Sequence, residues 1–338
     1  MAKRLFTALL FTTTINFAYA QGFVNKVQFF SDTSIITSAL KFDIRKLIVR
    51  KDVQGQLFPA TFSCKMGDSL NITDQIAIEV RGNFRRKHCY LPPLKLIYKQ
   101  NPSCAFYNFK DLKLVSTCMP TRNDDQNLLK EYLVYKIYNL LTDKSFRVRL
   151  LKMGYVDRAG KRSTITQHAF FIEDIKELAK RNSCKAVKNE KIPIRSTDRN
   201  QMTLASVFEY MIGNTDWSVP GNHNIRLIQP KSDSTALPFM VPYDFDFSGL
   251  VNTAYAFPDE RLGLGTVKRR MYRGAPITRE ELAPVLEFFN QKKTDIYAII
   301  NNFNLLTAES KKEITCYLDE FYTTINNPKD TQKAFSAE

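Results

Sequence analysis

Residues 76–83 have the sequence IAIEVRGN, in which apolar residues at every second position precede a turn that contains glycine. Two similar runs follow, LKLIY at 94–98 and LKL at 112–114. Alternation with a period of two is typical of strands that bury one face. Three such runs with short connections predict an antiparallel meander, so the first half of the chain is expected to be rich in strands.

Helical spacing of apolar residues dominates the second half of the chain. An apolar stripe at 129–141 predicts one helix, and a second stripe at 204–212 predicts another that ends at Gly213. The segment TREE at 278–281 has the capping-box pattern of a helix start, and a last helix is expected at 314–325. The patterns therefore predict an α+β protein in which a strand-rich lobe precedes a helix-rich lobe.

The first twenty residues have the features of a signal peptide. Lys3 and Arg4 precede an apolar stretch at 5–17, and Ala-Tyr-Ala at 18–20 matches a cleavage site. We therefore expect an exported protein, periplasmic or secreted, that comprises a strand-rich lobe at 21–172 and a helix-rich lobe at 173–338. No later apolar run reaches the ~20 residues that span a bilayer, so no transmembrane segment is expected.

Composition narrows the classes of function. The 338 residues are 44% hydrophobic and 25% charged, which excludes disordered and collagen-like classes. Lysine and arginine total 49 against 34 acids, a net charge of +15, which favours anionic partners. The charge is spread along the chain, so dedicated nucleic-acid binding is not expected. Among the 6 cysteines, Cys89 and Cys118 fall near the same end of the predicted hairpin, which predicts a disulfide between them.

A polar cluster at 213–224, GNTDWSVPGNHN, follows a predicted helix and precedes a predicted strand. Asp216 could act as a base or a metal ligand, and the carbonyl oxygens of Asn222 and Asn224 suit hard cations such as Mg²⁺. The alternative is a turn rich in Asn, Asp and Gly, in which the side chains hydrogen-bond their own backbone.

A second polar cluster lies at 241–249, VPYDFDFSG, at the end of a predicted strand. Strand alternation would place Asp244 and Asp246 on one face, where two carboxylates repel each other unless a cation or a shared proton intervenes. This arrangement indicates a divalent-metal site. The alternative is a pair of solvated acids on an edge strand.

Together these clusters resemble the core of the spore-coat-protein-H-like (CotH-type) kinases. The matching residues are GNTDW at 213–217, HNIRL at 223–227 and PYDFDF at 242–247. Upstream, RGN at 81–83 with LKL at 94–96 is similar to the family's turn and lysine-bearing strand, and FFIED at 170–174 resembles its hinge strand. The collinear matches cover about half of the chain.

The resemblance implies an atypical, protein-kinase-like two-lobed fold with an antiparallel sheet in its first lobe. It also implies transfer of a phosphoryl group from ATP or another nucleotide, with Mg²⁺ or Mn²⁺, to a hydroxyl of an unidentified protein or glycan. The alternative function is a catalytically silent domain that binds an anionic glycan, a peptide or a partner in the cell envelope.

Individual roles follow from the same resemblance. Lys95 would hold nucleotide phosphates and Glu131 would pair with it, although Lys87 and Lys113 are alternatives for the lysine. Asp216 would accept the proton of the acceptor hydroxyl. The other cofactor residues are Arg81, which is either a phosphate ligand or an ion-pair partner within the sheet, and Glu173 at the hinge. The metal ligands would be Asp244, Asp246 and either Asn222 or Asn224.

Overall fold

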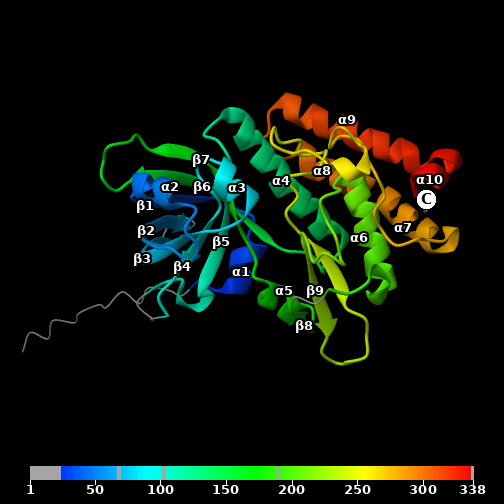
Figure 1. Cartoon of the computed structure of the whole chain (residues 1–338), viewed down its shortest axis with the longest axis horizontal. Coiled ribbons are helices and arrows are strands. Elements are labelled where there is room, and N and C mark those ends of the chain that lie inside the picture. The colour runs from blue at the N-terminus through cyan, green and yellow to red at the C-terminus, as the bar shows by residue number, and fades with distance from the viewer. Residues whose placement is uncertain (1–23, 67–69, 101–103, 189–190, 336–338) are drawn as a thin grey trace, which may run out of the picture.

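Seven strands in the first half of the chain form a closed barrel in the order β1-β2-β3-β4-β5-β7-β6 (Figure 1). The computed structural model describes residues 24–66, 70–100, 104–188 and 191–335, so the predicted signal peptide at 1–20 lies outside the described residues. The barrel strands are β1 (Ile36–Phe42), β2 (Leu57–Met66), β3 (Leu70–Val80), β4 (Leu94–Ile97), β5 (Asp111–Ser116), β6 (Val148–Asp157) and β7 (Ile165–Ile172).

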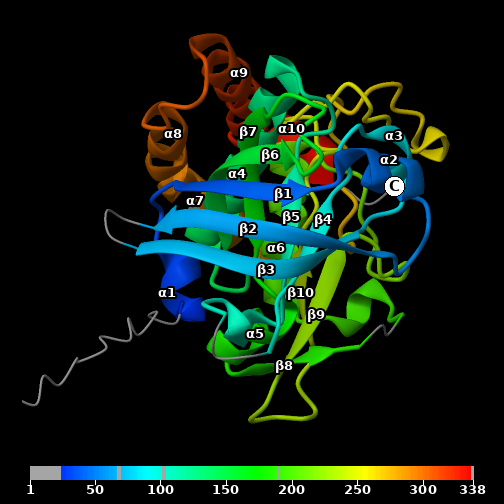
Figure 2. The same ribbon diagram turned by 90° about the vertical axis from the view of Figure 1, so that its left-hand side faces the viewer.

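The barrel closes through its first strand. β1 pairs antiparallel with β2 on one side and parallel with β6 on the other, where Ile36 lies opposite Leu151. Figure 2 shows β1, β2 and β3 side by side across the face of the barrel that is turned toward the viewer. All other neighbouring strands of the barrel are antiparallel.

The predicted α+β, protein-kinase-like two-lobed fold with an antiparallel sheet in its first lobe is wrong. The strands form a closed barrel with one parallel pair, within a structure of mixed α/β content. The sequence patterns missed β1 and β2, the strands that complete the barrel. Their inward positions include Ser38 and Ala60, and Pro59 interrupts β2, so the alternation of large apolar residues is weak there.

An aromatic core fills the barrel. Phe62 from β2 and Phe171 from β7 are fully buried, and their ring centroids lie 6.0 Å apart. Helix α1 (Lys26–Ser31) adds Phe29, whose ring lies 5.7 Å from that of Phe106. Because these rings fill the interior, the barrel encloses a packed core and not a channel. Full burial of one such side chain contributes roughly 1.5–3 kcal/mol to stability.

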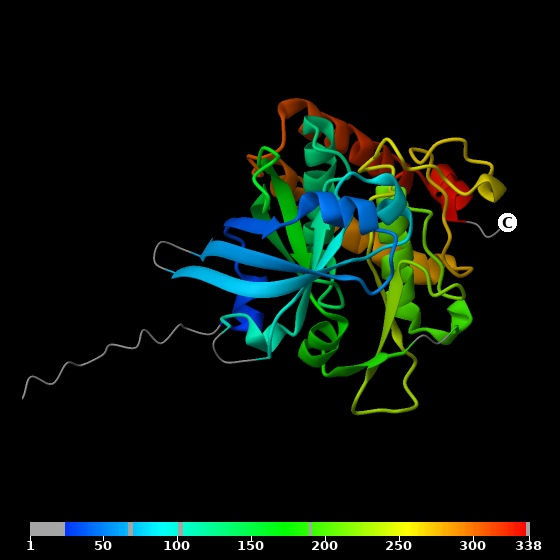
Figure 3. The same ribbon diagram turned by 60° about the vertical axis from the view of Figure 1, so that its left-hand side comes forward.

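The second half of the structure packs around two long helices. Helix α4 (Arg122–Leu141) lies between β6 and β7 of the barrel and the C-terminal helices, and α6 (Arg199–Ile212) packs against a three-stranded sheet. Figure 3 shows this sheet and the C-terminal helices on one side of the barrel. The remaining elements are α2 (Ile44–Arg50), α3 (Phe84–His88), α5 (Ile175–Arg181), β8 (Cys184–Val187), β9 (Ile225–Pro230), β10 (Phe239–Pro242), α7 (Arg279–Gln291), α8 (Lys293–Asn301), α9 (Ala308–Ile325) and α10 (Pro328–Phe335).

Two helix boundaries agree with their sequence signals. α6 ends at Gly213, whose φ of 67° is the left-handed conformation that glycine adopts at low cost. A Cβ atom there would collide with the Tyr317 hydroxyl. α7 begins with the predicted capping box between Thr278 and Glu281. Within the described ranges, no helix combines the length and the apolar character needed to cross a membrane.

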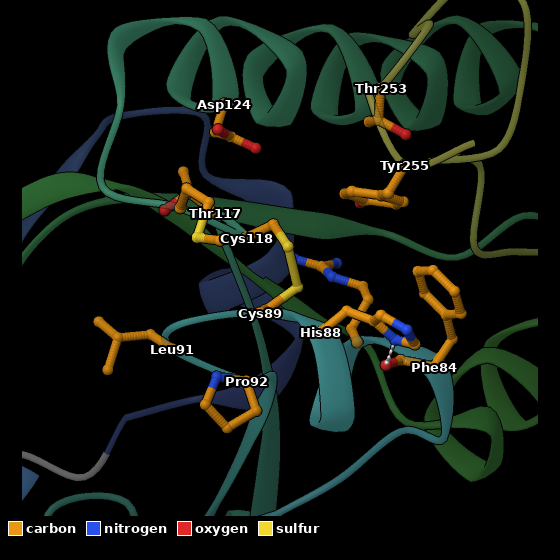
Figure 4. Close-up of a disulfide and its surroundings, with 12 residues drawn as sticks. Phe84, His88, Cys89, Leu91, Pro92, Thr117, Cys118, Asp124, Thr253 and Tyr255 are labelled. Atoms are coloured by element: carbon orange, nitrogen blue, oxygen red, sulfur yellow. Dashed lines mark hydrogen bonds between the residues drawn. A yellow bond between two sulfur atoms is a disulfide. The ribbon is translucent and has the colours of Figure 1, made fainter. Parts of the chain in front are cut away.

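The predicted disulfide between Cys89 and Cys118 is confirmed (Figure 4). The Cα atoms of the two cysteines lie 4.5 Å apart, and the bond joins the end of α3 to the segment that follows β5. In Figure 4, Phe84 and His88 of α3 lie beside the bond and are stacked on each other, with ring centroids 4.0 Å apart. The disulfide therefore anchors α3, a short helix of five residues, to the barrel wall.

Candidate active site

The loop between α6 and β9 presents the carboxylate of Asp216. His223 Nε2 lies 2.9 Å from Asp216 Oδ1, and Asn224 Nδ2 donates to Asp216 Oδ2 at 3.0 Å. The backbone N–H of Asp216 donates to Asn214 Oδ1 at 3.0 Å, so the residue is held at both its backbone and its side chain. The Asp216 side chain remains 38% exposed, which leaves the oriented carboxylate open to a ligand.

The geometry of this loop follows from its own sequence. Ser218 and His223 exchange two backbone hydrogen bonds and form an isolated β-bridge. Asn222 and Asn224 adopt φ angles of 49° and 51°, in the left-handed region that asparagine enters more readily than most residues. The loop therefore has some features of a simple turn, because Asn224 Nδ2 donates to the backbone oxygen of Asp216. The same nitrogen also donates to the Asp216 carboxylate, so the loop fixes a side chain as well as its own backbone.

Asp216 and His223 also line a cavity of about 390 Å³. The hydrogen bond to Asp216 raises the pKa of His223 above its usual value, against the opposing effect of burial. A raised pKa means that the imidazole holds its proton to higher pH. At neutral pH, a larger fraction of His223 is therefore protonated than of a free histidine, and the imidazolium lies beside the Asp216 carboxylate.

Asp244 and Asp246 follow β10 but do not continue it. The strand ends at Pro242, and Asp244 has a φ of 67°, so strand alternation does not set the direction of these two side chains. The two acids do interact, as predicted, but the turn after β10 brings them together and strand alternation does not. The backbone N–H of Asp244 donates to the Tyr135 hydroxyl at 2.9 Å. No hydrogen bond or ion pair to the Asp244 carboxylate is found within the described part of the chain.

Asp246 is buried and has two partners. Its Oδ2 accepts a hydrogen bond from the Tyr255 hydroxyl at 2.8 Å and lies 4.0 Å from a guanidinium nitrogen of Arg85. Burial raises the pKa of Asp246, and repulsion from Asp244 raises it further, although Arg85 opposes both effects. Asp246 is therefore not one of the solvated acids of the alternative interpretation.

Glu131 of α4 completes a group of three acids with Asp244 and Asp246, which we call the acid cluster. Glu131 is 2% exposed, and its Oε1 has no hydrogen-bond partner among the described residues. Burial and the charges of the other two acids raise the pKa of Glu131 well above its usual value. The carboxyl of Glu131 therefore holds its proton to higher pH, which reduces the repulsion within the group.

Two arginines face the acid cluster from the barrel side. Arg85 of α3 is buried, and its guanidinium donates to the backbone oxygen of Ser116. Arg81 follows β3, and its guanidinium donates to backbone oxygens of β4 and β5 at 3.3 and 3.5 Å. Interaction with Tyr255, and after it with the acid cluster, raises the pKa of Arg85 despite its burial. Sequence analysis missed Arg85, because it belongs to a helix of five residues that no apolar pattern of the sequence predicted.

The lysine side chains are arranged differently from the expectation. Lys95 of β4 forms an ion pair with Glu79, its register partner on β3, and not with Glu131. Lys113 of β5 lies opposite Lys95, and burial lowers its pKa, with Arg81 as an additional cause. Lys113, one of the alternatives for the lysine, is therefore the lysine that lies near Arg81.

The last two predicted residues occupy different settings. The Glu173 carboxylate accepts a hydrogen bond from the backbone N–H of Arg147 at 3.1 Å and forms an ion pair with Arg181 at 3.0 Å. These contacts stabilise the connection between β7 and α5. Asn222 is half-buried in the loop between α6 and β9. Electrostatic interactions connect the predicted residues that do gather at one site: Arg81, Glu131, Asp216, Asn224, Asp244 and Asp246.

The composition of this site suits a hard cation better than a soft one. Its donors are carboxylate and amide oxygens, the ligand types that Mg²⁺ prefers. Among the residues that the structure describes, no three or more His, Cys, Asp or Glu side chains are arranged to hold one metal ion. A cation here would therefore share its coordination with asparagine, with water or with the phosphates of a nucleotide.

No family model and no curated protein matches this chain.

Proposed function

We propose that the protein is an exported phosphotransferase of the type that the CotH resemblance implies. It transfers a phosphoryl group from ATP or another nucleotide to a hydroxyl of a protein or glycan acceptor, with Mg²⁺ or Mn²⁺. The observation that carries this proposal is the oriented Asp216 carboxylate, held by His223 and Asn224 at the wall of a cavity. The adjacent acid cluster and its arginines support the binding of a cation and of the nucleotide phosphates.

Asp216 has the geometry expected of the residue that accepts the proton of the acceptor hydroxyl. A carboxylate offers about four lone-pair positions, and the bonds from His223 and Asn224 occupy two of them. The remaining positions can accept a hydrogen bond from an incoming hydroxyl. Phosphoryl transfer requires orientation and charge neutralisation more than covalent chemistry, and this loop provides the orientation.

The acid cluster supports binding of a divalent cation. Asp244 has a carboxylate without a partner among the described residues, and Glu131 has a buried oxygen without one. Asp244, with Asn224 or Asn222, would hold Mg²⁺ or Mn²⁺, while Arg81 and Lys113 would face the phosphates of a nucleotide. When bound, the ion and the nucleotide supply the phosphoryl group and the positive charge that balances it.

The experiment uses purified wild-type protein and two substitutions at the site. Nucleotide binding is measured by thermal shift with ATP and other nucleotides, with and without Mg²⁺ or Mn²⁺, and transfer is measured with labelled nucleotide. Asp216→Asn should retain metal-dependent nucleotide binding but reduce transfer by about 10²–10⁴-fold, the usual contribution of a positioned base. Asp244→Asn should instead remove metal-dependent binding.

Asp233→Asn is the matched control, because it removes the same charge from an exposed loop between β9 and β10. It should leave both binding and transfer unchanged. Full transfer activity in Asp216→Asn would overturn the role of Asp216. If the wild type binds no nucleotide under any metal condition, the alternative of a catalytically silent binding domain replaces the proposal.

A further inference from the structure

The cavity in front of Asp216 contains an arginine that the proposed transfer does not use. Arg273 lines this cavity, together with Trp217 and Phe257. It comes from the irregular segment before α7, where the neighbouring Gly274 lies so close to Tyr272 and Ser206 that a Cβ atom would collide with both. Close packing therefore holds the backbone that presents Arg273.

Arg273 is a half-buried cation without an ion pair. One guanidinium nitrogen donates to the backbone oxygen of Thr215, and no carboxylate of the described residues lies within 4.0 Å of the side chain. Burial lowers the pKa of Arg273, and the more distant charges of Asp259 and Asp216 only partly oppose this effect. A desolvated guanidinium of this kind gains strongly from an anionic partner.

The other charged side chains of the cavity have ion-pair partners, because His223 is paired with Asp216. Asp259 is paired with Arg261, and Ser218 Oγ accepts a hydrogen bond from the backbone N–H of Gly221 at 2.9 Å. Among these lining residues, Arg273 is the cation without a carboxylate partner, and Asp216 is the oriented carboxylate with lone pairs left open, so a ligand can engage these two groups without displacing an ion pair. The rest of the wall includes apolar surface, such as the ring of Phe257, which is 72% exposed.

From this inventory we infer that the acceptor is a peptide segment in which an acidic residue flanks the serine or threonine that receives the phosphoryl group. The hydroxyl would lie at Asp216, and the flanking carboxylate would form a bidentate hydrogen-bonded pair with Arg273. A peptide of this kind presents one hydroxyl and one carboxylate, which matches the two available polar groups. A sugar ring would present several hydroxyls to side chains that are already engaged. This inference rests on the proposed function.

The chain carries its own reporter for the test. Trp217 is the single tryptophan of the protein and lines the cavity. Its fluorescence is titrated, without nucleotide, with three nine-residue peptides whose central serine is flanked on both sides by Glu, Gln or Lys. The Glu peptide should bind about 10-fold or more tightly than the Gln peptide, the range expected for a hydrogen bond to a charged group. This preference should persist at 0.3 M salt, where general attraction to a basic protein is screened.

Substitutions separate Arg273 from the overall charge of the protein. Arg273→Ala should remove the preference for Glu, Arg273→Lys should retain only part of it because the planar fork is lost, and Arg273→Glu should favour the Lys peptide. Arg269→Ala is the matched control, because Arg269 lies in the same segment but does not line the cavity. It should bind the three peptides as the wild type does. Melting temperatures would verify that each variant folds.

Because fluorescence requires no turnover, the inference and the proposed function can fail separately. Equal binding of the Glu and Gln peptides by a protein that transfers phosphate would overturn the inference alone. Weaker nucleotide binding in Arg273→Ala, with unchanged peptide binding, would also overturn it and would assign Arg273 to the nucleotide. Tighter binding of a uronic-acid oligosaccharide than of the Glu peptide would overturn it in favour of a glycan acceptor.

Discussion

Buried acids occur both at the end of barrel strand β6 and in the acid cluster, but their surroundings differ. Asp157, at the end of β6, accepts hydrogen bonds from the backbone N–H groups of Ile44 and Lys161 at 3.3 and 3.0 Å. These bonds lower its pKa, although burial opposes them. Asp246 is similarly unexposed, yet its pKa is raised, first by burial and then by repulsion from Asp244, and no backbone N–H of the described residues donates to its carboxylate. A buried acid that backbone donors satisfy supports the fold, whereas a group of buried acids that repel one another indicates a ligand site.

The largest expected effect comes from removing the disulfide that anchors α3, since this helix carries Arg85 toward the acid cluster. The double substitution of Cys89 and Cys118 by serine should lower the free energy of unfolding by about 3 kcal/mol, because the bond closes a loop of 29 residues. Urea denaturation measures the change, and Cys316→Ser, at an exposed free thiol, is the control that should show almost none. An unchanged free energy in the double variant would mean that packing alone holds α3.

The next largest effect on stability is expected from substitution of Asp246, which tests the repulsion within the acid cluster. The pKa of Asp246 is raised from 3.8 to about 7, so its native state loses stability as the pH rises through this interval. Asp246→Asn should therefore stabilise the protein at pH 8, by on the order of 2 kcal/mol, and change little at pH 3, where the carboxyl is neutral in both the native and the unfolded state. Thermal denaturation at both values measures the difference. A loss of stability at pH 8 would show that attraction to Arg85 outweighs the repulsion.

The opposite pH dependence is expected for Asp157. Because its pKa is lowered from 3.8, its contribution to stability is present at neutral pH and is lost as the pH falls through the lowered value. Asp157→Asn should lower the melting temperature at pH 7, by less than removal of the disulfide, and the difference should vanish in strong acid. The same sign of effect for Asp157→Asn and Asp246→Asn at neutral pH would break the comparison between the two kinds of acid.

The smallest effect is expected at Lys95. Its ion pair with Glu79 is partly exposed, and such pairs contribute about 0–1 kcal/mol. Lys95→Ala should therefore change stability little and, in a nucleotide titration, bind more like the wild type than Lys113→Ala does. If Lys95→Ala loses nucleotide binding while Lys113→Ala retains it, the original expectation for Lys95 is correct despite its pairing with Glu79.

Local signals in the sequence predicted much of the chain correctly. The glycine stop at Gly213, the capping box at Thr278 and the disulfide between Cys89 and Cys118 each depend on neighbouring residues or on a single hairpin. Closure of the barrel was not predictable in this way, because it depends on pairing between strands that are distant in sequence and have weak alternation. The kinase-like fold was inferred from motifs, and motifs do not specify how the sheet closes.

The same contrast between local signals and long-range contacts explains which residues of the site were predicted. The two polar clusters contain Asp216, Asp244 and Asp246, so composition alone brought attention to them. The partners of Lys95 and Glu131 depend on strand register and on burial of α4, neither of which the sequence displays. The lysine that lies near Arg81 could only be chosen once the register of β4 and β5 was known.

The parallel pairing of β1 with β6 has a consequence for the order of folding. Strand β1 emerges early during synthesis, but its second neighbour is complete only when the chain has reached Asp157. Until then its free edge is a template for pairing with other chains, and contacts of such high sequence separation form slowly. A chain that crosses a membrane before folding would carry this open edge with it. The chain should therefore need chaperones that prevent aggregation only until β1 pairs with β6.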